Sequence, residues 1–237
     1  MNNLQGKTAL ITGGSKGIGY GIAESMLKEG MNVAITSRQQ ESADAALHKL
    51  SGIGTGKLIA LVADVRDFDA QHNAVAKTLE AFGQIDVLIA NAGLGHFAPI
   101  TALTPEQWHE TIDTNLTGVF YSLKAALDAL TQSKGYFISI SSLAGTNFFA
   151  NASAYNASKF GLVGFTQAVM LDLREAGIKC STIMPGSVAT HFNNHEPNPA
   201  DAWKIQPEDI GQMVVDLLKM NPRTLPSKIE VRPSLPK

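Results

Sequence analysis

The sequence predicts a single α/β domain, built on a doubly wound parallel β-sheet of about seven strands with helices on both faces. Short apolar runs alternate with segments of helical periodicity along the whole chain, and this alternation is typical of right-handed βαβ units. The 237 residues, of which 44% are hydrophobic, suffice for one sizeable core. No linker-like run divides them, so residues 1–237 are interpreted as one domain whose ligands bind at the carboxyl ends of the strands.

The first half of the chain contains three strand–helix pairs. Residues 7–12 are apolar and end in a glycine cluster, after which residues 18–28 have helical periodicity. The same succession recurs as a strand at 31–36 with a helix at 40–50, and as a strand at 58–62 with a helix at 67–82. A fourth strand is predicted at 85–90.

The second half continues the pattern with longer helices. Thr104 and Pro105 are suited to the cap and first position of a helix that extends to about residue 130. Strands at 136–140 and 178–184 flank a long helix at 152–176, and the dipeptide Pro185-Gly186 stops the second of these strands. A helix at 207–220 and a short strand at 228–231 complete the sheet.

Composition excludes several classes of partner. The net charge is −2 and no basic block is present, which argues against nucleic acid and against a membrane surface as partners. The first residues lack the pattern of a signal peptide, and the longest uncharged stretch, residues 135–158, is rich in Ser, Asn and Gly. The single cysteine, Cys180, is expected in the core and permits no internal disulfide, so we expect a cytoplasmic protein.

Tyr155 and Lys159 are spaced to lie one turn apart on one face of the 152–176 helix. A phenol titrates near pH ~10, and a nearby ammonium lowers that pKa by favouring the phenolate. A shift of roughly 3 units requires about 4 kcal/mol of differential stabilisation, and it makes Tyr155 a general acid/base near neutral pH. Ser142 stands upstream with a hydroxyl that can hold a substrate oxygen, and Ser141 is the alternative to it.

Residues 12–19 read Thr-Gly-Gly-Ser-Lys-Gly-Ile-Gly, following one predicted strand and opening a helix. Glycines let the backbone turn sharply and approach a pyrophosphate, and the positive end of the helix favours the phosphates. In this context the motif predicts a Rossmann-type dinucleotide site. Its expected cofactor-binding residues are Gly13, Ser15, Lys16, Gly17, Ile18 and Gly19.

The end of the second predicted strand bears on which dinucleotide binds. It reads Ile-Thr-Ser-Arg, without the carboxylate that often binds the ribose hydroxyls of NAD. Arg38 can instead grip a 2′-phosphate, Lys16 adds a second cation, and Ser37 can donate a hydrogen bond. These residues favour NADP(H), and NAD(H) is the alternative.

The chain resembles the short-chain dehydrogenase/reductase family, in its compact single-domain branch of carbonyl and 3-oxoacyl reductases. The matching motifs after the glycine loop are Asp64-Val65, Asn91-Ala92-Gly93, Asn115, Ser142, Tyr155-x-x-x-Lys159 and the Pro-Gly-Ser-Val-Ala-Thr run at 185–190. The resemblance implies that Asp64 and Val65 hold the adenine and that Asn91, Ala92 and Gly93 let the backbone pass close to the cofactor. It further implies that Pro185, Gly186, Val188 and Thr190 surround the nicotinamide.

The resemblance also implies catalytic roles. Tyr155 exchanges the proton, Ser142 stabilises the substrate oxygen, and Lys159 holds the nicotinamide ribose and lowers the pKa of Tyr155. Asn115 interrupts its helix and holds a water that leads to the lysine. The implied reaction is hydride transfer between NADP(H) and a small carbonyl/alcohol pair, chiefly ketone reduction. An alcohol dehydrogenase running oxidatively and a non-catalytic NADPH sensor are the alternatives.

The substrate is expected to contact loops that follow the strands. The candidate residues are His96, Asn147, Phe148, Phe149 and His191, with Phe97 beside the first of them and a mobile lid at about residues 187–206. His191 and His195 lack further ligands, so no metal site is expected. Oxoacyl thioesters, small ketones, diketones and pterin-like carbonyls all remain open as substrates.

The family resemblance implies a homo-oligomer, because the helices that hold Asn115 and Tyr155 commonly pair across a two-fold axis in its members. The chain ends Ser-Lys-Ile-Glu-Val-Arg-Pro at residues 227–233. Many members carry a Gly-Gly there, before a tail that supports tetramers. Homodimer and homotetramer are therefore both expectations, with the dimer favoured.

Overall fold

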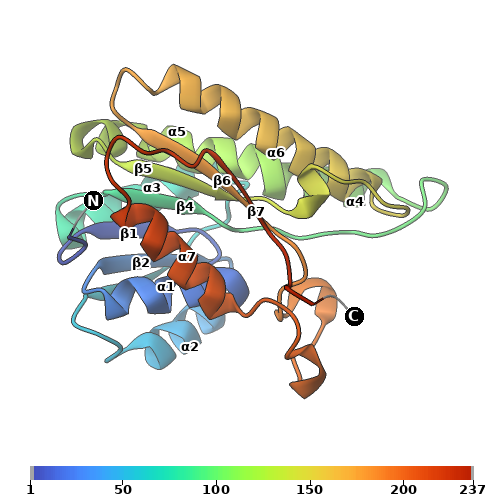
Figure 1. The fold of residues 1–237 in the computed structure, drawn as a ribbon, viewed down its shortest axis with the longest axis horizontal. Coiled ribbons are helices and arrows are strands. Elements are labelled where there is room, and N and C mark those ends of the chain that lie inside the picture. The colour runs from blue at the N-terminus through green and yellow to red at the C-terminus, as the bar shows by residue number, and fades with distance from the viewer. Residues whose placement is uncertain (1–2, 236–237) are drawn as a thin grey trace.

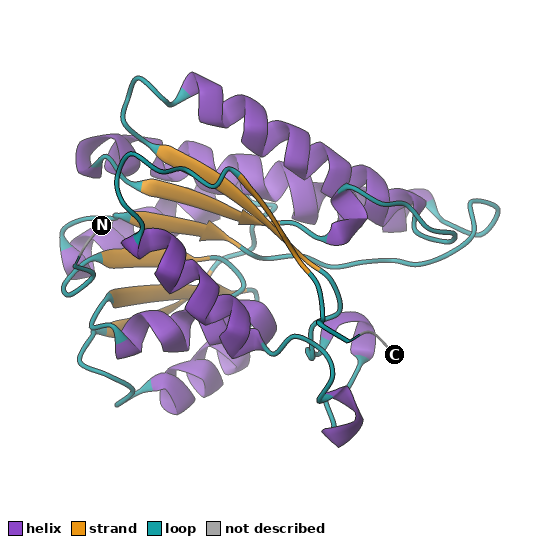
Figure 2. Ribbon diagram, in the orientation of Figure 1, coloured by secondary structure: helices purple, strands orange, loops and turns teal. Residues whose placement is uncertain are grey.

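The computed structural model describes residues 3–235 and confirms the predicted α/β architecture. Its sheet has seven parallel strands in the order β3-β2-β1-β4-β5-β6-β7, between two layers of helices (Figures 1 and 2). The strands are β1 (Thr8–Ile11), β2 (Asn32–Ser37), β3 (Leu58–Val62), β4 (Val87–Ala90), β5 (Tyr136–Ile140), β6 (Lys179–Pro185) and β7 (Lys228–Val231). The order reverses between β1 and β4, which is the switch point where such sheets bind ligands.

The helices divide between the two faces of the sheet, each over its own apolar cluster (Figure 1). One face carries α1 (Gly17–Lys28), α2 (Gln40–Leu50) and α7 (Pro207–Lys219). The other carries α3 (Phe68–Phe82), α5 (Gly118–Ser133) and α6 (Ser153–Asp172), with α4 (Pro105–Ile112) packed against α6. Free Cys180 is buried in the second cluster, as predicted. None of the helices in residues 3–235 combines the length and the apolar run needed to cross a bilayer.

The predicted helix at 105–130 is wrong as one continuous element. It begins as expected, with Thr104 and Gln107 forming a capping box, but a π-helical turn at Asp113–Thr117 separates α4 from α5. The apolar pattern continues across this turn, so periodicity does not reveal it. The predicted helix at 152–176 is also too long, because α6 ends at Asp172 and the chain then turns through Gly177, whose φ is +78°.

Two glycines bring α1 and α7 into close contact. A Cβ added at Gly21 would lie 2.4 Å from the carbonyl oxygen of Pro207, and one added at Gly211 would lie 2.4 Å from that of Gly21. Since both neighbours are backbone atoms, they cannot rotate away. We expect Gly21→Ala to lower the free energy of unfolding by about 1–3 kcal/mol, as overpacking typically does, measured by urea denaturation.

The control is Gly164→Ala in α6, where an added Cβ would meet nothing within 4 Å. Alanine is favoured over glycine within a helix by roughly 1 kcal/mol, so this variant should be at least as stable as the wild type. The oligomeric state of both variants is measured alongside. Equal stability of Gly21→Ala and wild type would contradict the close packing of α1 on α7.

Candidate active site

The carboxyl ends of the central strands bring the predicted site residues to one edge of the sheet. The glycine loop follows β1, the Asn-Ala-Gly turn follows β4, and the serine pair follows β5. The loop after β6 returns to the same edge and lies against the glycine loop, because a Cβ added at Gly17 would be 3.4 Å from Thr190. Motifs distant in sequence therefore meet at the switch point.

Tyr155, Lys159 and Ser142 lie together at this edge. Tyr155 and Lys159 project from the first turns of α6 and are 9% and 5% exposed. The Lys159 ammonium lies 5.8 Å from the centre of the Tyr155 ring and donates to the carbonyl oxygen of Ile140 at 3.1 Å. Ser142 is the neighbouring side chain whose hydroxyl acts on the phenol and lowers its pKa. A proton donor, a second hydroxyl and a cation thus share one site.

The two neighbouring serines have different surroundings. Ser141 is buried, and its hydroxyl donates to the carbonyl oxygen of Lys159 at 3.2 Å. Ser142 instead reaches the Tyr155 phenol, and its oxygen accepts from the backbone N–H of Ala144 at 3.1 Å. The geometry therefore favours Ser142 as the substrate-facing hydroxyl. The Ser141 hydroxyl instead anchors α6 through its bond to the Lys159 carbonyl oxygen.

The predicted lowering of the Tyr155 pKa is not what the structure shows. Burial raises the pKa of Tyr155, and the hydrogen bond with Ser142 offsets only part of that rise. Burial also lowers the pKa of Lys159 to about 8. Removal from water disfavours the charged form of each group, so the phenol is held protonated at neutral pH. A protonated phenol is suited to donating a proton to a substrate.

Asn115 lies in the π-helical turn and is fully buried. Its amide donates to the carbonyl oxygen of Leu94 at 2.8 Å and to the Ser158 hydroxyl at 3.0 Å, and its oxygen accepts from the Leu94 N–H at 2.9 Å. The wider turn thus directs Asn115 onto the loop that follows β4. A Cβ added at Gly93 would lie 3.3 Å from the Asn115 oxygen and 3.6 Å from the Lys159 nitrogen, so both side chains face this glycine.

The glycine loop has the features that dinucleotide phosphates need. Gly13 and Gly17 have positive φ, +64° and +59°. The cap position of α1, Lys16, makes no side-chain cap bond, so its side chain does not use the backbone N–H groups that phosphates bind at a helix N-terminus. Ile18 packs against the core, and a Cβ at Gly19 would lie 2.5 Å from the Asn91 amide.

Asn91 holds the glycine loop onto β4. Its amide donates to the carbonyl oxygens of Thr12 at 3.0 Å and of Gly13 at 2.9 Å. The Thr12 hydroxyl accepts in return from the backbone N–H groups of Asn91 and Ala92, at 3.0 and 3.2 Å. A Cβ at Gly13 would lie 2.9 Å from the Ala92 Cα. The Asn-Ala-Gly turn therefore fixes the shape of the loop as well as ending its strand.

The ends of β2 and β3 carry a charged network. Arg38 is half exposed, and its guanidinium lies 3.8 Å from the Glu110 carboxylate. Arg66, which sequence reasoning missed, lies 3.8 Å from the same carboxylate and bonds Asp64 at 2.6 Å. This bond is the largest cause of the lowered pKa of Asp64. The Ser15 and Ser37 hydroxyls lie 3.3 Å apart beside the network. In the sequence, the only signal for Arg66 is its position directly after the Asp64-Val65 motif.

His96 joins this network, although it was expected to line the substrate pocket. Its Nε2 lies 2.8 Å from Glu110, which draws the ring toward the charged residues.

Val65, which was expected to contact the adenine, has a buried side chain that packs on Gly118, where a Cβ would lie 2.7 Å away. Any contact of Val65 with an adenine must therefore come from its backbone.

The loop after β6 is held at both ends. Pro185 pairs with Val231 as the last residue of β6, and Gly186 donates to the Val231 carbonyl oxygen at 2.8 Å. Val188 forms a bridge with Ile205. Strand β6 thus ends one residue later than predicted. The bridge between Val188 and Ile205 brings the two ends of the 187–206 segment side by side.

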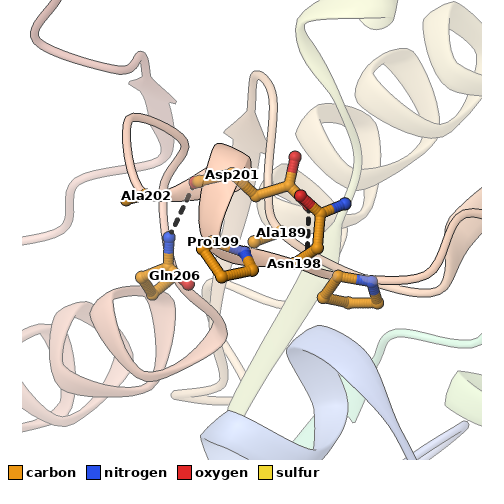
Figure 3. Close-up of a pocket in the computed structure, with 7 residues that line it drawn as sticks. Ala189, Asn198, Pro199, Asp201, Ala202 and Gln206 are labelled. Atoms are coloured by element: carbon orange, nitrogen blue, oxygen red, sulfur yellow. Dashed lines mark hydrogen bonds between the residues drawn. The ribbon is translucent and has the colours of Figure 1, made fainter.

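Polar contacts order the predicted lid at residues 187–206. The Asp201 carboxylate lies 2.5 Å from His195 Nε2 and 2.6 Å from the Lys204 ammonium, and these two groups lower its pKa. Gln206 donates to the Asp201 carbonyl oxygen at 3.2 Å, beside a cavity of about 330 Å³ (Figure 3). His191 lies 3.3 Å from Glu196. In the described part of the chain, no group of three or more His, Cys, Asp or Glu side chains could hold a metal ion.

Aromatic rings surround Tyr155. Phe97 and Phe192 have ring centres 5.3 and 5.6 Å from that of Tyr155, and Phe149 stacks on Phe97 at 6.2 Å. Phe192 was not singled out in the sequence, where it is one residue of an irregular segment. Phe148, which was expected in the pocket, is 84% exposed. The Asn147 amide turns back to the Leu143 carbonyl oxygen at 3.3 Å.

Known proteins share both the sequence pattern and the architecture. Residues 7–200 match the short chain dehydrogenase family. A 3-oxoacyl-[acyl-carrier-protein] reductase of Synechocystis is 36% identical over 202 residues, which cover 83% of this chain and 81% of the relative. An alcohol dehydrogenase from the archaeon Thermococcus sibiricus, solved with 5-hydroxy-NADP, superposes with a TM-score of 0.91 at 28% identity, over 98% of both chains. A short chain dehydrogenase from Burkholderia cenocepacia, solved with NADP, has a TM-score of 0.88 at 32% identity, over 98% of both chains.

Proposed function

This chain belongs to the short-chain dehydrogenase family of oxidoreductases, and from that premise we propose that it is an NADPH-dependent ketone reductase. The observation that carries the proposal is the buried Tyr155 phenol, which lies beside the Ser142 hydroxyl and the Lys159 ammonium. Because burial favours the protonated phenol, the site is better suited to reduction than to alcohol oxidation. The test is NADPH consumption by the purified protein with a panel of ketones, diketones, quinones, aldehydes, pterins and 3-oxoacyl thioesters. Tight NADPH binding without any turnover would instead favour the sensor.

The residues of the carboxyl edge fit a bound dinucleotide phosphate. The glycine loop and the N-terminus of α1 would hold the pyrophosphate, and the 185–190 loop would lie along the nicotinamide. When bound, the reduced nicotinamide supplies the hydride that the carbonyl carbon gains, and it is oxidised by two electrons as the carbonyl is reduced. NADP(H) is supported by the arginines at the ends of β2 and β3 and by the NADP in the related structures.

The chain's own residues manage the proton. As negative charge builds on the carbonyl oxygen, Tyr155 gives it a proton and the Ser142 hydroxyl donates a hydrogen bond to it. The Lys159 ammonium stabilises the phenolate that remains, and solvent returns the proton. Asn115 holds the backbone of Leu94, next to the Gly93 turn that faces the lysine, so it acts as a positioning residue.

The cofactor preference is tested by Arg38→Ala. A planar guanidinium binds a 2′-phosphate with charge-assisted hydrogen bonds, each worth about 1.5–3 kcal/mol, so we expect the NADPH dissociation constant to rise by about 10–100-fold. The dissociation constant for NADH should change little, because that cofactor lacks the 2′-phosphate. Both constants are measured by fluorescence titration. An equal rise in the two dissociation constants would show that Arg38 does not bind the 2′-phosphate.

Arg66→Ala is the companion variant. Arg66 is fixed to Asp64 by a 2.6 Å ion pair, whereas Arg38 faces only the more distant Glu110 among the ion pairs of the described residues. Arg38 is therefore freer to turn toward a phosphate. We expect Arg66→Ala to weaken both cofactors, because it releases the Asp64 carboxylate that lies at the adenine end of the site.

A homodimer is the proposed assembly. Large apolar side chains lie exposed on α5 and α6, among them Phe120 and Phe160, and the Phe120 ring packs edge-on against Phe165. Apolar patches that remain exposed on a helix pair are typical of interfaces, and these side chains would contribute to one. Light scattering on the eluted protein measures the mass directly, and a monomer at micromolar concentration would contradict the proposal.

The cytoplasm is the proposed location. It is supported by the free, buried thiol of Cys180, since reducing compartments preserve thiols. Fractionation of cells that express the protein tests this, and recovery outside the cytoplasmic fraction would contradict it.

A further inference from the structure

The aromatic rings around Tyr155 form a collar, which we define as Phe97, Phe149 and Phe192. Each ring comes from a different loop, after β4, after β5 and after β6. Phe97 is central, since it contacts Tyr155 at 5.3 Å, Phe149 at 6.2 Å and Phe192 at 6.2 Å between ring centres. Two of the rings therefore lie against the Tyr155 ring and the third lies against Phe97, so the collar is next to the residue that a substrate carbonyl approaches.

Gly95 lets the collar close. A Cβ at this position would lie 2.8 Å from Cε2 of Phe97 and 2.9 Å from Cζ of Phe192. The absence of a side chain thus brings two rings from distant loops together. Phe149 and Phe192 nevertheless remain 53% and 38% exposed. Solvent-exposed aromatic surface beside a proton donor is available to bury an apolar group of a substrate.

The three loops that carry the collar offer almost no positive charge. The loops at 91–104, 141–152 and 186–206 contain no arginine and only one lysine, Lys204. The Lys204 side chain is 20% exposed and is paired with Asp201 at 2.6 Å. Glu196, in contrast, is 87% exposed at its side chain. Beyond the loops, Arg232 is paired with Glu230 at 2.8 Å.

We infer that the substrate is a neutral ketone with an aromatic ring next to the carbonyl, and that anionic thioesters of coenzyme A or a carrier protein are poor substrates. An aromatic substituent gains offset and edge-on contacts with the collar beyond its buried area. The phosphates of a coenzyme A or carrier-protein thioester need cations to bind and to be steered to the site, and these three loops present none that is unpaired. This inference rests on the proposed ketone reduction and names its substrate class.

A matched pair of esters tests the aromatic preference. Ethyl benzoylformate and ethyl pyruvate share an activated ketone and differ by a phenyl in place of a methyl. We expect kcat/KM with NADPH to be about tenfold or more higher for the phenyl compound, which corresponds to two or three ring contacts of 0.5–1.5 kcal/mol each. Phe149→Ala and Phe192→Ala should each reduce that preference several-fold, measured as the ratio of kcat/KM for the two esters within each variant.

The control variant is Ile100→Ala, which removes an apolar side chain that is 75% exposed in the same loop as Phe97. It should keep the phenyl preference of the wild type. Circular dichroism and NADPH affinity of every variant show whether a change reflects the collar or loss of folding. A preference that survives in both phenylalanine variants would overturn the role of the collar.

Ethyl acetoacetate and acetoacetyl-coenzyme A test the charge argument, because they carry the same 3-oxo group on a neutral and on an anionic carrier. We expect the neutral ester to have the higher kcat/KM. A higher value for the thioester, falling steeply with added salt, would overturn the inference while leaving ketone reduction intact. Failure of every ketone in the wild type would overturn the proposed function itself, so the two failures are distinguishable.

Discussion

Tyr155→Phe is expected to lower kcat for ketone reduction by about 10²–10⁴-fold, the contribution of a positioned general acid, with NADPH affinity nearly unchanged. The substitution removes only the hydroxyl and keeps the ring that packs against Phe97 and Phe192. The proton that the substrate oxygen needs must then come from solvent. Steady-state kinetics and fluorescence titration of NADPH measure the two quantities on the same preparation.

Tyr136→Phe is the matched control. Tyr136 is also a buried phenol with a raised pKa, about 12, but it begins β5 at the opposite edge of the sheet and bonds Ser181 at 2.7 Å. Losing that hydrogen bond should cost about 1 kcal/mol of stability and leave turnover intact. Substantial activity in Tyr155→Phe, or an equal loss in both variants, would contradict the assignment of Tyr155.

The same assignment gives a pH dependence. Because burial raises the pKa of Tyr155, the phenol stays protonated through neutral pH, and reduction requires that form. We expect kcat for reduction to stay level between about pH 6 and 7 and the phenol to limit it only above its ordinary value of ~10. A decline near pH 8 would belong to Lys159, whose pKa burial lowers to about 8.

The fold was predictable because most of its strands are short, largely apolar and bounded by turn residues. The alternation of strand and helix periodicity along the chain then predicts a parallel sheet and the edge of that sheet at which ligands bind. The π-helical turn at Asp113–Thr117 was not predictable from periodicity, since Leu116 continues the spacing of apolar residues across it, although the family resemblance implied an interruption at Asn115. It depends on the buried amide of Asn115 finding partners on Leu94 and Ser158, which are contacts between distant segments.

The candidate site, like the fold, was predictable only in part. Spacing alone placed Tyr155 and Lys159 on one face of a helix, and the order of the motifs brought Ser142 to them. Spacing did not predict the sign of the pKa shift at Tyr155, because that depends on how deeply both groups are buried. It also missed Phe192 and Arg66, whose positions follow from the course of irregular loops and from an ion pair with Asp64.

Ser142→Ala is expected to lower kcat by about 10²–10³-fold, the usual cost of removing one donor to a developing oxyanion. The Ser142 hydroxyl reaches the Tyr155 phenol, so it lies where the substrate oxygen receives its proton. Its loss removes a hydrogen bond that strengthens as charge develops on that oxygen. The effect should therefore appear in kcat as well as in kcat/KM, as expected for an interaction made chiefly in the transition state.

Ser141→Ala separates this role from a structural one, because the two serines are adjacent and differ in what they touch. The Ser141 hydroxyl bonds only the carbonyl oxygen of Lys159 among the hydrogen bonds of the described residues, so its removal should cost about 1 kcal/mol of stability and little kcat. If Ser141→Ala instead abolished turnover while Ser142→Ala retained it, the substrate-facing hydroxyl would be that of Ser141. A small loss of kcat in both variants would mean that Tyr155 and Lys159 stabilise the oxyanion without either serine. The role of Ser141 would then be only to anchor the helix that carries those two residues.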